Sequence, residues 1–265
     1  MLQLSSIDYW SPLEIATILF VLLILAFFAG YKTRQYKIQK SVNYINEEMG
    51  LISSTLLGLL ALILAFSFGM ANSRFDTRRS LAIEEANAIG TVILRAEVFP
   101  DSMRKELKLS LKNYLEERIA FNESGTDVEK ILFHFNKSDE LGKTIWKQIS
   151  EYSRKDLVLV KTSEIIPALN EMIDLTTSRR AAGEANIPNS IQWFLIILCV
   201  FSTFLLGYER KNKLDWIIVV GFSLMLSLTV FSIMDLDRPR FGLVTLEEEN
   251  SKFIELRALF KQEGE

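Results

Sequence analysis

The stretch from Leu51 to Arg95 constrains the fold most, because an apolar run passes into a polar one without a helix breaker. Its first part, LISSTLLGLLALILAFSFGMA, has no charged residue and is long enough to cross a hydrocarbon layer of roughly 30 Å. The second part contains no proline and is rich in good helix formers. The sequence therefore predicts one helix, residues 51–98, that leaves the membrane and continues into water.

Side chains within the apolar run sort by size. Small residues recur at three- and four-residue steps, a spacing that lets another helix approach closely; they are Gly58, Ala61, Ala65 and Gly69. Bulky residues recur at every fourth position and form a separate stripe of Leu60, Leu64 and Phe68. Two interpretations stay open: ordinary helix packing explains both stripes, or the bulky stripe lines a narrow apolar neck of a pore.

Three further apolar blocks bring the number of predicted spans to four. The first begins at Ser11 and Pro12, where a candidate N-cap precedes a proline in the first turn. The third follows Pro188, and the fourth runs from about Trp216 to Met234. With 49% hydrophobic residues concentrated in these blocks, we expect an all-α integral membrane protein whose four spans form two hairpins.

Between the second and third spans lies a polar insert, residues 72–187, without any alternating strand pattern. We expect a bundle of helices. Thr126 with Glu129 resembles a capping box that opens a short helix, and Ser138 or Asp139 is expected to open the next one. The predicted segments are 1–50 with the first span, 51–98, 99–187 as the helical insert, 188–234 as the second transmembrane hairpin, and 235–265 as an amphipathic tail.

Charge and chemistry exclude several functions. The chain has 30 basic and 33 acidic residues, a nearly balanced charge of −3, so no field of one sign favours nucleic acid as a partner. His134 is the single histidine and Cys199 the single cysteine, which leaves no metal cluster by spacing. No phosphate-binding loop or nucleophile with a base is present. We therefore expect no enzyme, cofactor or metal.

Charged residues follow the second span closely: Arg74, Arg78, Arg79, Glu84 and Glu85. Exposed charges commonly do no more than solvate a helix, because individual surface pairs are weak. Alternatively, several copies around an axis pair between neighbouring subunits and set the electrostatic potential at a pore mouth. The sequence does not choose between these two interpretations.

The side of the membrane on which the insert lies is also left open by charge. The two short loops carry seven basic residues, which favours a cytoplasmic position for them and an external insert. Seven arginines crowd the membrane edge on the insert's own side, so the two counts are equal: Arg74, Arg78, Arg79, Arg179, Arg180, Arg238 and Arg240.

Several stretches together resemble the bestrophin-like membrane family, a bacterial and plant group. They are LLGLLALILAFSF with SRFDTRRSLAIEEANAIGTVILRAEVFP, then ALNEMIDL, Arg179 and IP before the third span, and DLDRPRFGLV after the fourth. The group is named for a remoter likeness to bestrophins, which are pentameric anion channels with four helices per subunit and an insert between the second and third.

The resemblance implies a homo-oligomeric channel in the lipid bilayer, a pentamer by analogy, that conducts small anions through an apolar neck on the second helix. It also implies an insert on the cytoplasmic side of a plasma membrane, the inner membrane in a bacterium. The paired tryptophans and the acidic calcium clasp of bestrophins have no counterpart here, so calcium gating is not implied. A non-conducting membrane scaffold or sensor is the alternative function.

Overall fold

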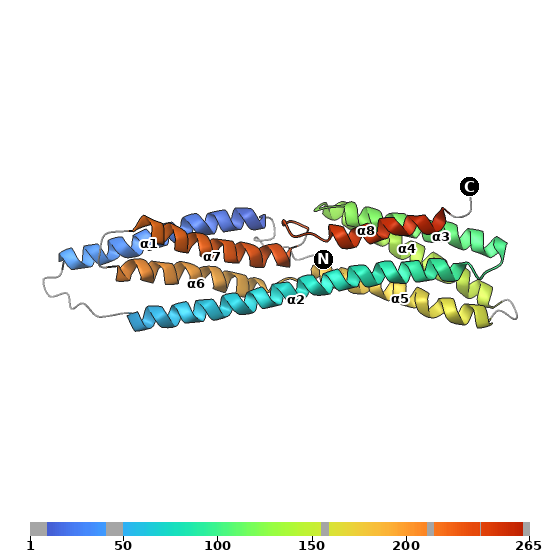
Figure 1. Ribbon diagram of the computed structural model, residues 1–265, viewed down its shortest axis with the longest axis horizontal. Coiled ribbons are helices and arrows are strands. Elements are labelled where there is room, and N and C mark those ends of the chain that lie inside the picture. Colours follow the sequence, from blue (N-terminus) through green and yellow to red (C-terminus); the bar gives the residue numbers. More distant parts are fainter. Residues whose placement is uncertain (1–9, 41–49, 155–158, 211–214, 239, 262–265) are drawn as a thin grey trace. The chain divides into compact units, whose positions relative to one another are not determined.

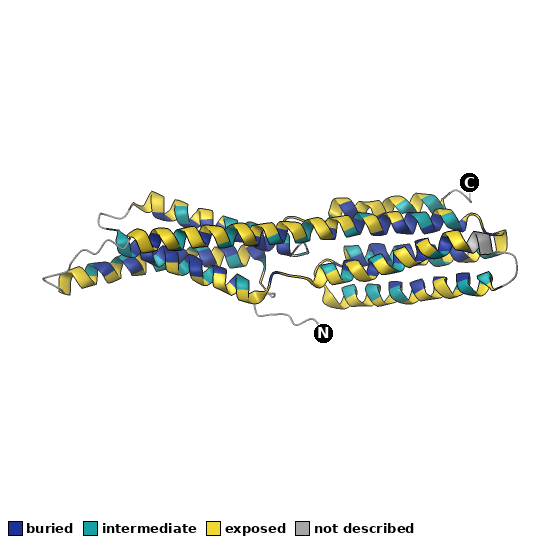
Figure 2. Cartoon of the chain, turned by 90° about the horizontal axis from the view of Figure 1, so that it is seen from below, coloured by how far each residue is buried: buried dark blue, intermediate teal, exposed yellow. Residues whose placement is uncertain are grey.

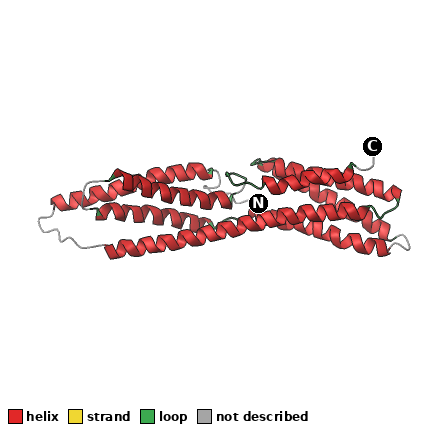
Figure 3. Cartoon of the chain, in the orientation of Figure 1, coloured by secondary structure: helices red, strands yellow, loops and turns green. Residues whose placement is uncertain are grey.

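The computed structural model describes residues 10–40, 50–154, 159–210, 215–238 and 240–261. Within these ranges every regular element is helical and no strand is present (Figure 3). In chain order the elements are α1 Pro12–Lys40, α2 Gly50–Ala96, α3 Asp101–Glu123, α4 Val128–Ser153, α5 Leu159–Glu184, α6 Asn189–Glu209, α7 Trp216–Asp237, α8 Glu247–Glu255 and the short 3-10 helix η1 Leu256–Phe260 (Figure 1).

Helices α1, α2, α6 and α7 are long and apolar enough to cross a membrane. The prediction of an all-α membrane protein with four spans is thereby confirmed, and the chain is a multi-pass membrane protein. The long second helix is likewise continuous from Gly50 to Ala96. The grouping of the spans into two hairpins stays a prediction, since α1 packs mainly against α6 and α7.

The chain divides into two compact units. The spanning unit comprises Met1–Phe75 and Asn186–Val244, and the insert unit comprises Asp76–Ala185 and Thr245–Glu265. Helix α2 supplies residues to both, because the division falls within it. The C-terminal segment that carries α8 and η1 belongs to the insert unit.

Two glycines let α1 and α6 touch through their backbones in the spanning unit. A side-chain Cβ at Gly30 would overlap the carbonyl oxygen of Phe204, and one at Gly207 would overlap the carbonyl oxygen of Phe27. Small residues at such positions are the usual means of close packing between membrane helices. Next to this contact, Arg34 donates from Nη1 to the Tyr208 carbonyl oxygen at 2.9 Å and so binds the carboxyl end of α6.

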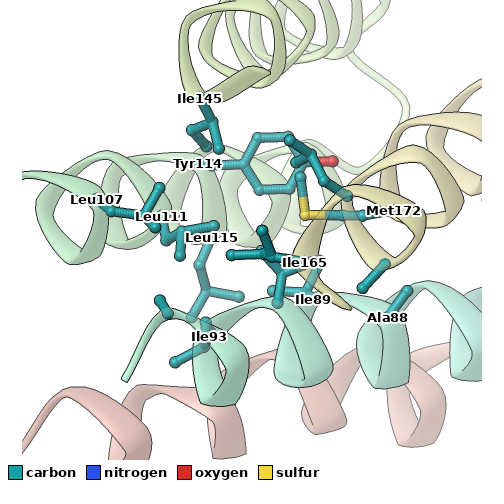
Figure 4. Packing of buried hydrophobic residues seen from close by; sticks show 14 of the residues in the cluster. Ala88, Ile89, Ile93, Leu107, Leu111, Tyr114, Leu115, Ile145, Ile165 and Met172 are labelled. Carbon is teal, nitrogen blue, oxygen red and sulfur yellow. The ribbon is translucent and has the colours of Figure 1, made fainter. Parts of the chain in front are cut away.

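The insert unit has its own hydrophobic core, to which α2, α3, α4 and α5 each contribute (Figure 4). Ile89 and Ile93 of α2 face Leu111 and Leu115 of α3, all fully buried. Phe253 of α8 is buried in the same cluster. The insert is thus a helical bundle that also incorporates the C-terminal helix.

Helix ends agree with the sequence in one case and differ in another. At α1, the Ser11 hydroxyl accepts from the Glu14 amide while the Glu14 carboxylate accepts from the Ser11 amide, so the predicted start is confirmed. The predicted break at Ser138 is wrong, because α4 continues to Ser153 and begins after Asp127, which caps it in place of Thr126. Within the helix, the Ser138 hydroxyl donates to the Phe135 carbonyl oxygen at 2.8 Å.

Candidate functional site

The candidate site is helix α2, which carries every pore residue that the sequence proposes. One row of its side chains is buried and recurs mostly at seven-residue steps: Ser53, Leu60, Ser67, Ala71, Arg78, Glu85 and Val92. The opposite face is exposed along the helix, as the two colours of α2 show in Figure 2. Because an α-helix turns about 100° per residue, Leu62 lies nearly opposite Leu60. The helix therefore has an inner and an outer face within its own subunit.

The neck candidates do not share one face. Leu60 is 2% exposed and packs in the core of the spanning unit, Leu64 is half-buried, and Phe68 is 45% exposed. The reason is geometric, because each four-residue step exceeds a full turn by about 40°. Over Leu60, Leu64 and Phe68 the stripe turns from the inner face toward the outer one. The outer face instead carries Leu59, Leu62 and Phe66, which are 39%, 50% and 62% exposed.

The small residues lie on that outer face. Gly58, Ala61, Ala65 and Gly69 are all exposed, and a Cβ added at Gly58 or Gly69 would meet no other atom within 4 Å. A shallow hollow follows the same side of the helix, lined by Ala65, Phe66, Gly69, Met70, Ser73 and Arg74. These small residues do not pack against other helices of their own subunit, so their surface is open to another chain or to lipid.

The charges after the span are divided between the two faces. Arg78 points inward, where its guanidinium donates to the carbonyl oxygens of Ala182 at 3.0 Å and Ala185 at 2.6 Å. Ala182 lies in the last turn of α5 and Ala185 directly follows the helix, so both carbonyls lie at the negative end of the helix dipole. Arg79 donates from Nε to Glu249 Oε1 of α8 at 2.5 Å. Arg78 and Arg79, two of the three arginines predicted for the pore mouth, thus bind groups of their own unit.

Glu84 and Glu85 are adjacent in the sequence but have opposite environments. Glu84 is exposed, and its Oε1 accepts from the Ser80 hydroxyl at 2.6 Å. Glu85 is fully buried and binds two arginines: Arg118 donates to it at 2.5 and 3.0 Å, and Arg179 at 2.8 Å. Glu85 therefore pairs with arginines of its own chain, and pairing between neighbouring subunits was one of the two interpretations that the sequence left open.

Two buried guanidinium groups determine the ionisation of Glu85. Burial alone would raise the pKa of its carboxyl, but the attraction of Arg118 and Arg179 and their hydrogen bonds outweigh it and hold the pKa below the ordinary value. Burial also raises the pKa of the nearby Tyr114 hydroxyl to about 12. That hydroxyl lies 2.7 Å from Thr176 Oγ1. The centre of the insert unit is therefore a charged and hydrogen-bonded network.

Arg179 joins four helices in this network. Besides Glu85 of α2, its guanidinium donates to Asn122 of α3 at 2.9 Å and to Asn250 of α8 at 2.8 Å. The same group lies over the ring of Phe253, 5.0 Å from its centroid. Sequence reasoning assigned Arg179 to the membrane edge and missed these contacts. The only sequence signal for this network was Glu85, an acidic residue at a position of the buried seven-residue row of α2.

The motif DLDR at the end of α7 organises the edge of the spanning unit. The Asp235 carboxylate accepts from the amides of Leu243 at 2.7 Å and Val244 at 3.1 Å, which closes the turn after the helix. The Asp237 carboxylate accepts from the Ile187 amide at 2.9 and 3.1 Å, just before α6 begins. The motif thus binds the segment before α6 and the segment after α7 through backbone amides, which is a structural role.

The lone histidine pairs with a carboxylate on the surface of the insert unit. His134 Nδ1 lies 2.7 Å from Glu117 Oε2, and Lys137 binds the other oxygen at 2.6 Å. No group of three histidine, cysteine or acidic side chains that could hold a metal occurs among the described residues. Cys199 is buried in the spanning unit.

Comparison with known proteins adds the family. The profile of the bestrophin-like domain matches residues 15–250. A search of curated proteins gives no match. Among solved structures, one variant of a bacterial bestrophin homologue from Klebsiella pneumoniae has a TM-score of 0.72 at 13% identity, covering 96% of this chain and 98% of its own.

Two other solved structures agree on the fold. A second variant of the Klebsiella pneumoniae homologue has a TM-score of 0.68 at 15% identity and covers 93% of this chain and 99% of its own. A structure described as a membrane protein has a TM-score of 0.69 at 14% identity, with 93% and 99% covered. The profile match extends over most of the sequence, and the chain therefore belongs to the bestrophin-like family.

Proposed function

We propose that this protein is an ion channel, a homo-oligomer in which copies of α2 surround a central pore. Family membership and the shared fold support an ion-channel kind of function. The observation that carries the proposal is the outer face of α2. It combines exposed bulky side chains at Leu62 and Phe66 with small residues that leave room for a neighbouring helix.

The neck is proposed to consist of Leu59, Leu62 and Phe66. Leu60 packs into the core of its own subunit, so it cannot face an axis while the subunit keeps this conformation. A ring of exposed apolar side chains conducts only when it is wide enough to stay hydrated, because an ion loses part of its hydration on passing. The neck therefore acts as the gate in this proposal.

The ion, the assembly and the orientation are further parts of the proposal. The resemblance to bestrophins suggests five subunits and small anions. The burial of Arg78 and the ion pair of the exposed Arg79 with Glu249 do not favour anions. We place the protein in a bacterial inner membrane with the insert in the cytoplasm, because the topology of related proteins is a stronger constraint than equal counts of basic residues.

Two triple variants test the neck. In liposomes, alanine at Leu59, Leu62 and Phe66 is expected to raise ion flux, because it widens and shortens the dry zone. Alanine at Leu60, Leu64 and Phe68 is the matched control. It removes Leu60, which packs in the subunit core, and Leu64, which packs against that core, so the expected result is a loss of stability of several kcal/mol on the scale of core truncations.

The measurements are flux and the midpoint of thermal unfolding in detergent. Higher flux in the variant with alanine at Leu60, Leu64 and Phe68 than in the variant with alanine at Leu59, Leu62 and Phe66 would contradict the proposed neck. It would assign the neck to the stripe that includes Leu60. No flux in the wild type or in either variant would leave the non-conducting scaffold as the function.

Assembly is tested separately. A leucine at Gly69 is expected to block oligomer formation by keeping neighbouring helices apart, whereas leucine at Gly183 on α5, also in open space, should leave it intact. Crosslinking in detergent that gives only monomers for the wild type would contradict the homo-oligomer.

A further inference from the structure

The charges on the outer face of α2 indicate which class of ion the channel would select. Arg78 is 4% exposed and held by two carbonyl oxygens of its own unit. Arg79 pairs with Glu249, and the attraction and hydrogen bond of that carboxylate raise the pKa of the guanidinium. Arg78 is therefore buried against carbonyl oxygens, whereas Arg79 is exposed but has the Glu249 carboxylate as its counter-charge.

Oxygen-bearing side chains cover the outer face of α2 in the insert unit. Ser80, Glu84 and Asn87 follow one another at steps of four and three residues, so they project from the same side of the helix. All three are exposed. The Ser80 hydroxyl donates to the Glu84 carboxylate at 2.6 Å and so restricts the position of that carboxylate. This face presents a carboxylate, a hydroxyl and an amide.

We infer that the channel conducts cations and that Glu84 is the residue that selects them. The inference rests on the proposed function, because it requires copies of α2 around one axis. Each subunit then contributes one Glu84 carboxylate to a ring in the insert unit. A ring of carboxylates attracts cations and repels anions, which is how cation channels commonly discriminate.

Two other charged residues of α2, Asp76 and Arg74, contribute to the electrostatic potential on its outer face. Asp76 is exposed and adds a negative charge that also attracts Arg79. Arg74 is half-buried on the flank of the outer hollow, beside Met70 and Ser73. Arg74 is thus the residue on which an anion preference would depend. The contributions of Arg74 and of Glu84 to ion selectivity can be separated by mutating each residue in turn.

The experiment measures the reversal potential of reconstituted wild-type protein across a tenfold potassium chloride gradient. A cation preference is expected. Glu84→Gln should reduce the permeability ratio of potassium to chloride several-fold, and Glu84→Lys should bring it below one. Glu171→Gln is the matched control, since Glu171 is an exposed glutamate on α5 away from α2, and the ratio should not change.

Gel filtration and the unfolding midpoint of each variant establish that the assembly is intact. A chloride preference in the wild type that Glu84→Gln leaves unchanged would overturn the inference while the channel stands. A chloride preference that disappears in Arg74→Gln would also overturn it and assign selectivity to Arg74. A wild type that passes no ion would overturn the proposed function itself.

Discussion

Glu85 of α2 and Arg179 of α5 are separated by 94 residues, yet they form a 2.8 Å ion pair in the buried interior of the insert unit. A second guanidinium, from Arg118, binds the same carboxylate. Breaking a buried pair by removing one partner leaves an uncompensated charge in a poorly solvated place, which is far more costly than losing a surface pair.

Glu85→Gln is therefore expected to destabilise the protein by about 3–5 kcal/mol, because two buried guanidinium groups lose their counter-charge. The measurement is thermal or chemical unfolding in detergent. The matched control is Glu84→Gln, which removes the same charge from the exposed neighbouring position and should change stability by less than about 1 kcal/mol. Equal effects of the two substitutions would contradict the role of the buried network.

The hydroxyl of Tyr114 should make stability fall at alkaline pH. Its pKa is raised to about 12 in the fold, chiefly by burial, whereas an exposed tyrosine titrates at 10.0. The unfolded chain therefore releases this proton first, and the contribution to stability, complete below pH 10, is lost between pH 10 and about pH 12. The slope of this contribution is about 1.4 kcal/mol per pH unit.

Comparing variants isolates that contribution. Tyr114→Phe should show a shallower decline of the unfolding midpoint between pH 10 and 12, whatever its stability at neutral pH. Tyr36→Phe, at an exposed tyrosine of α1, should decline as the wild type does. The assignment to Tyr114 fails if its phenylalanine variant keeps the wild-type slope.

Alanine at Gly30 or Gly207 should separate α1 from α6. The added methyl group would overlap a backbone carbonyl in each case, so the helices must move apart, at a cost of about 1–3 kcal/mol or more. The unfolding midpoint in detergent measures the loss. Gly221→Ala is the control, because a Cβ at this position of α7 meets nothing within 4 Å. A Gly30→Ala protein as stable as the Gly221→Ala protein would contradict the close contact.

The side of the insert can be decided by labelling whole cells with a membrane-impermeant thiol reagent. The background is Cys199→Ala, and single cysteines replace Thr126 in the insert unit and Lys40 at the end of α1, both exposed. A cytoplasmic insert predicts labelling at position 40 alone. Labelling at position 126 alone would place the insert outside.

The sequence predicted the helices well because their signals are local. Charge-free runs, the proline after Ser11 and the absence of breakers in residues 51–95 each act over a few residues. The orientation of α2 about its own axis was not predictable in the same way. Its span is apolar on every side, so hydrophobicity does not distinguish Leu60, which is buried, from Leu62, which is not.

The ion network could not be read from the sequence for another reason. Arg118 and Arg179 reach Glu85 from helices that only the tertiary fold brings together, and no spacing rule links them. Arg179 in particular counted as a membrane-edge charge, although it is buried in the insert unit, with 8% of its surface exposed. Charge counts treat every basic residue alike, whereas burial determines which of them the bilayer or a permeating ion can sense.

The buried row of α2 also determines how this helix winds against the other helices of its own unit. A strict seven-residue repeat falls about 20° behind a straight helix per repeat and so favours a left-handed supercoil, as between Ser53, Leu60 and Ser67. The step from Ser67 to Ala71 is four residues, a stutter that advances the row by about 40° and cancels the drift of about two repeats. The packing of α2 against the helices of its own unit would locally unwind at that point, so a small change of twist there would turn the side chains that follow it.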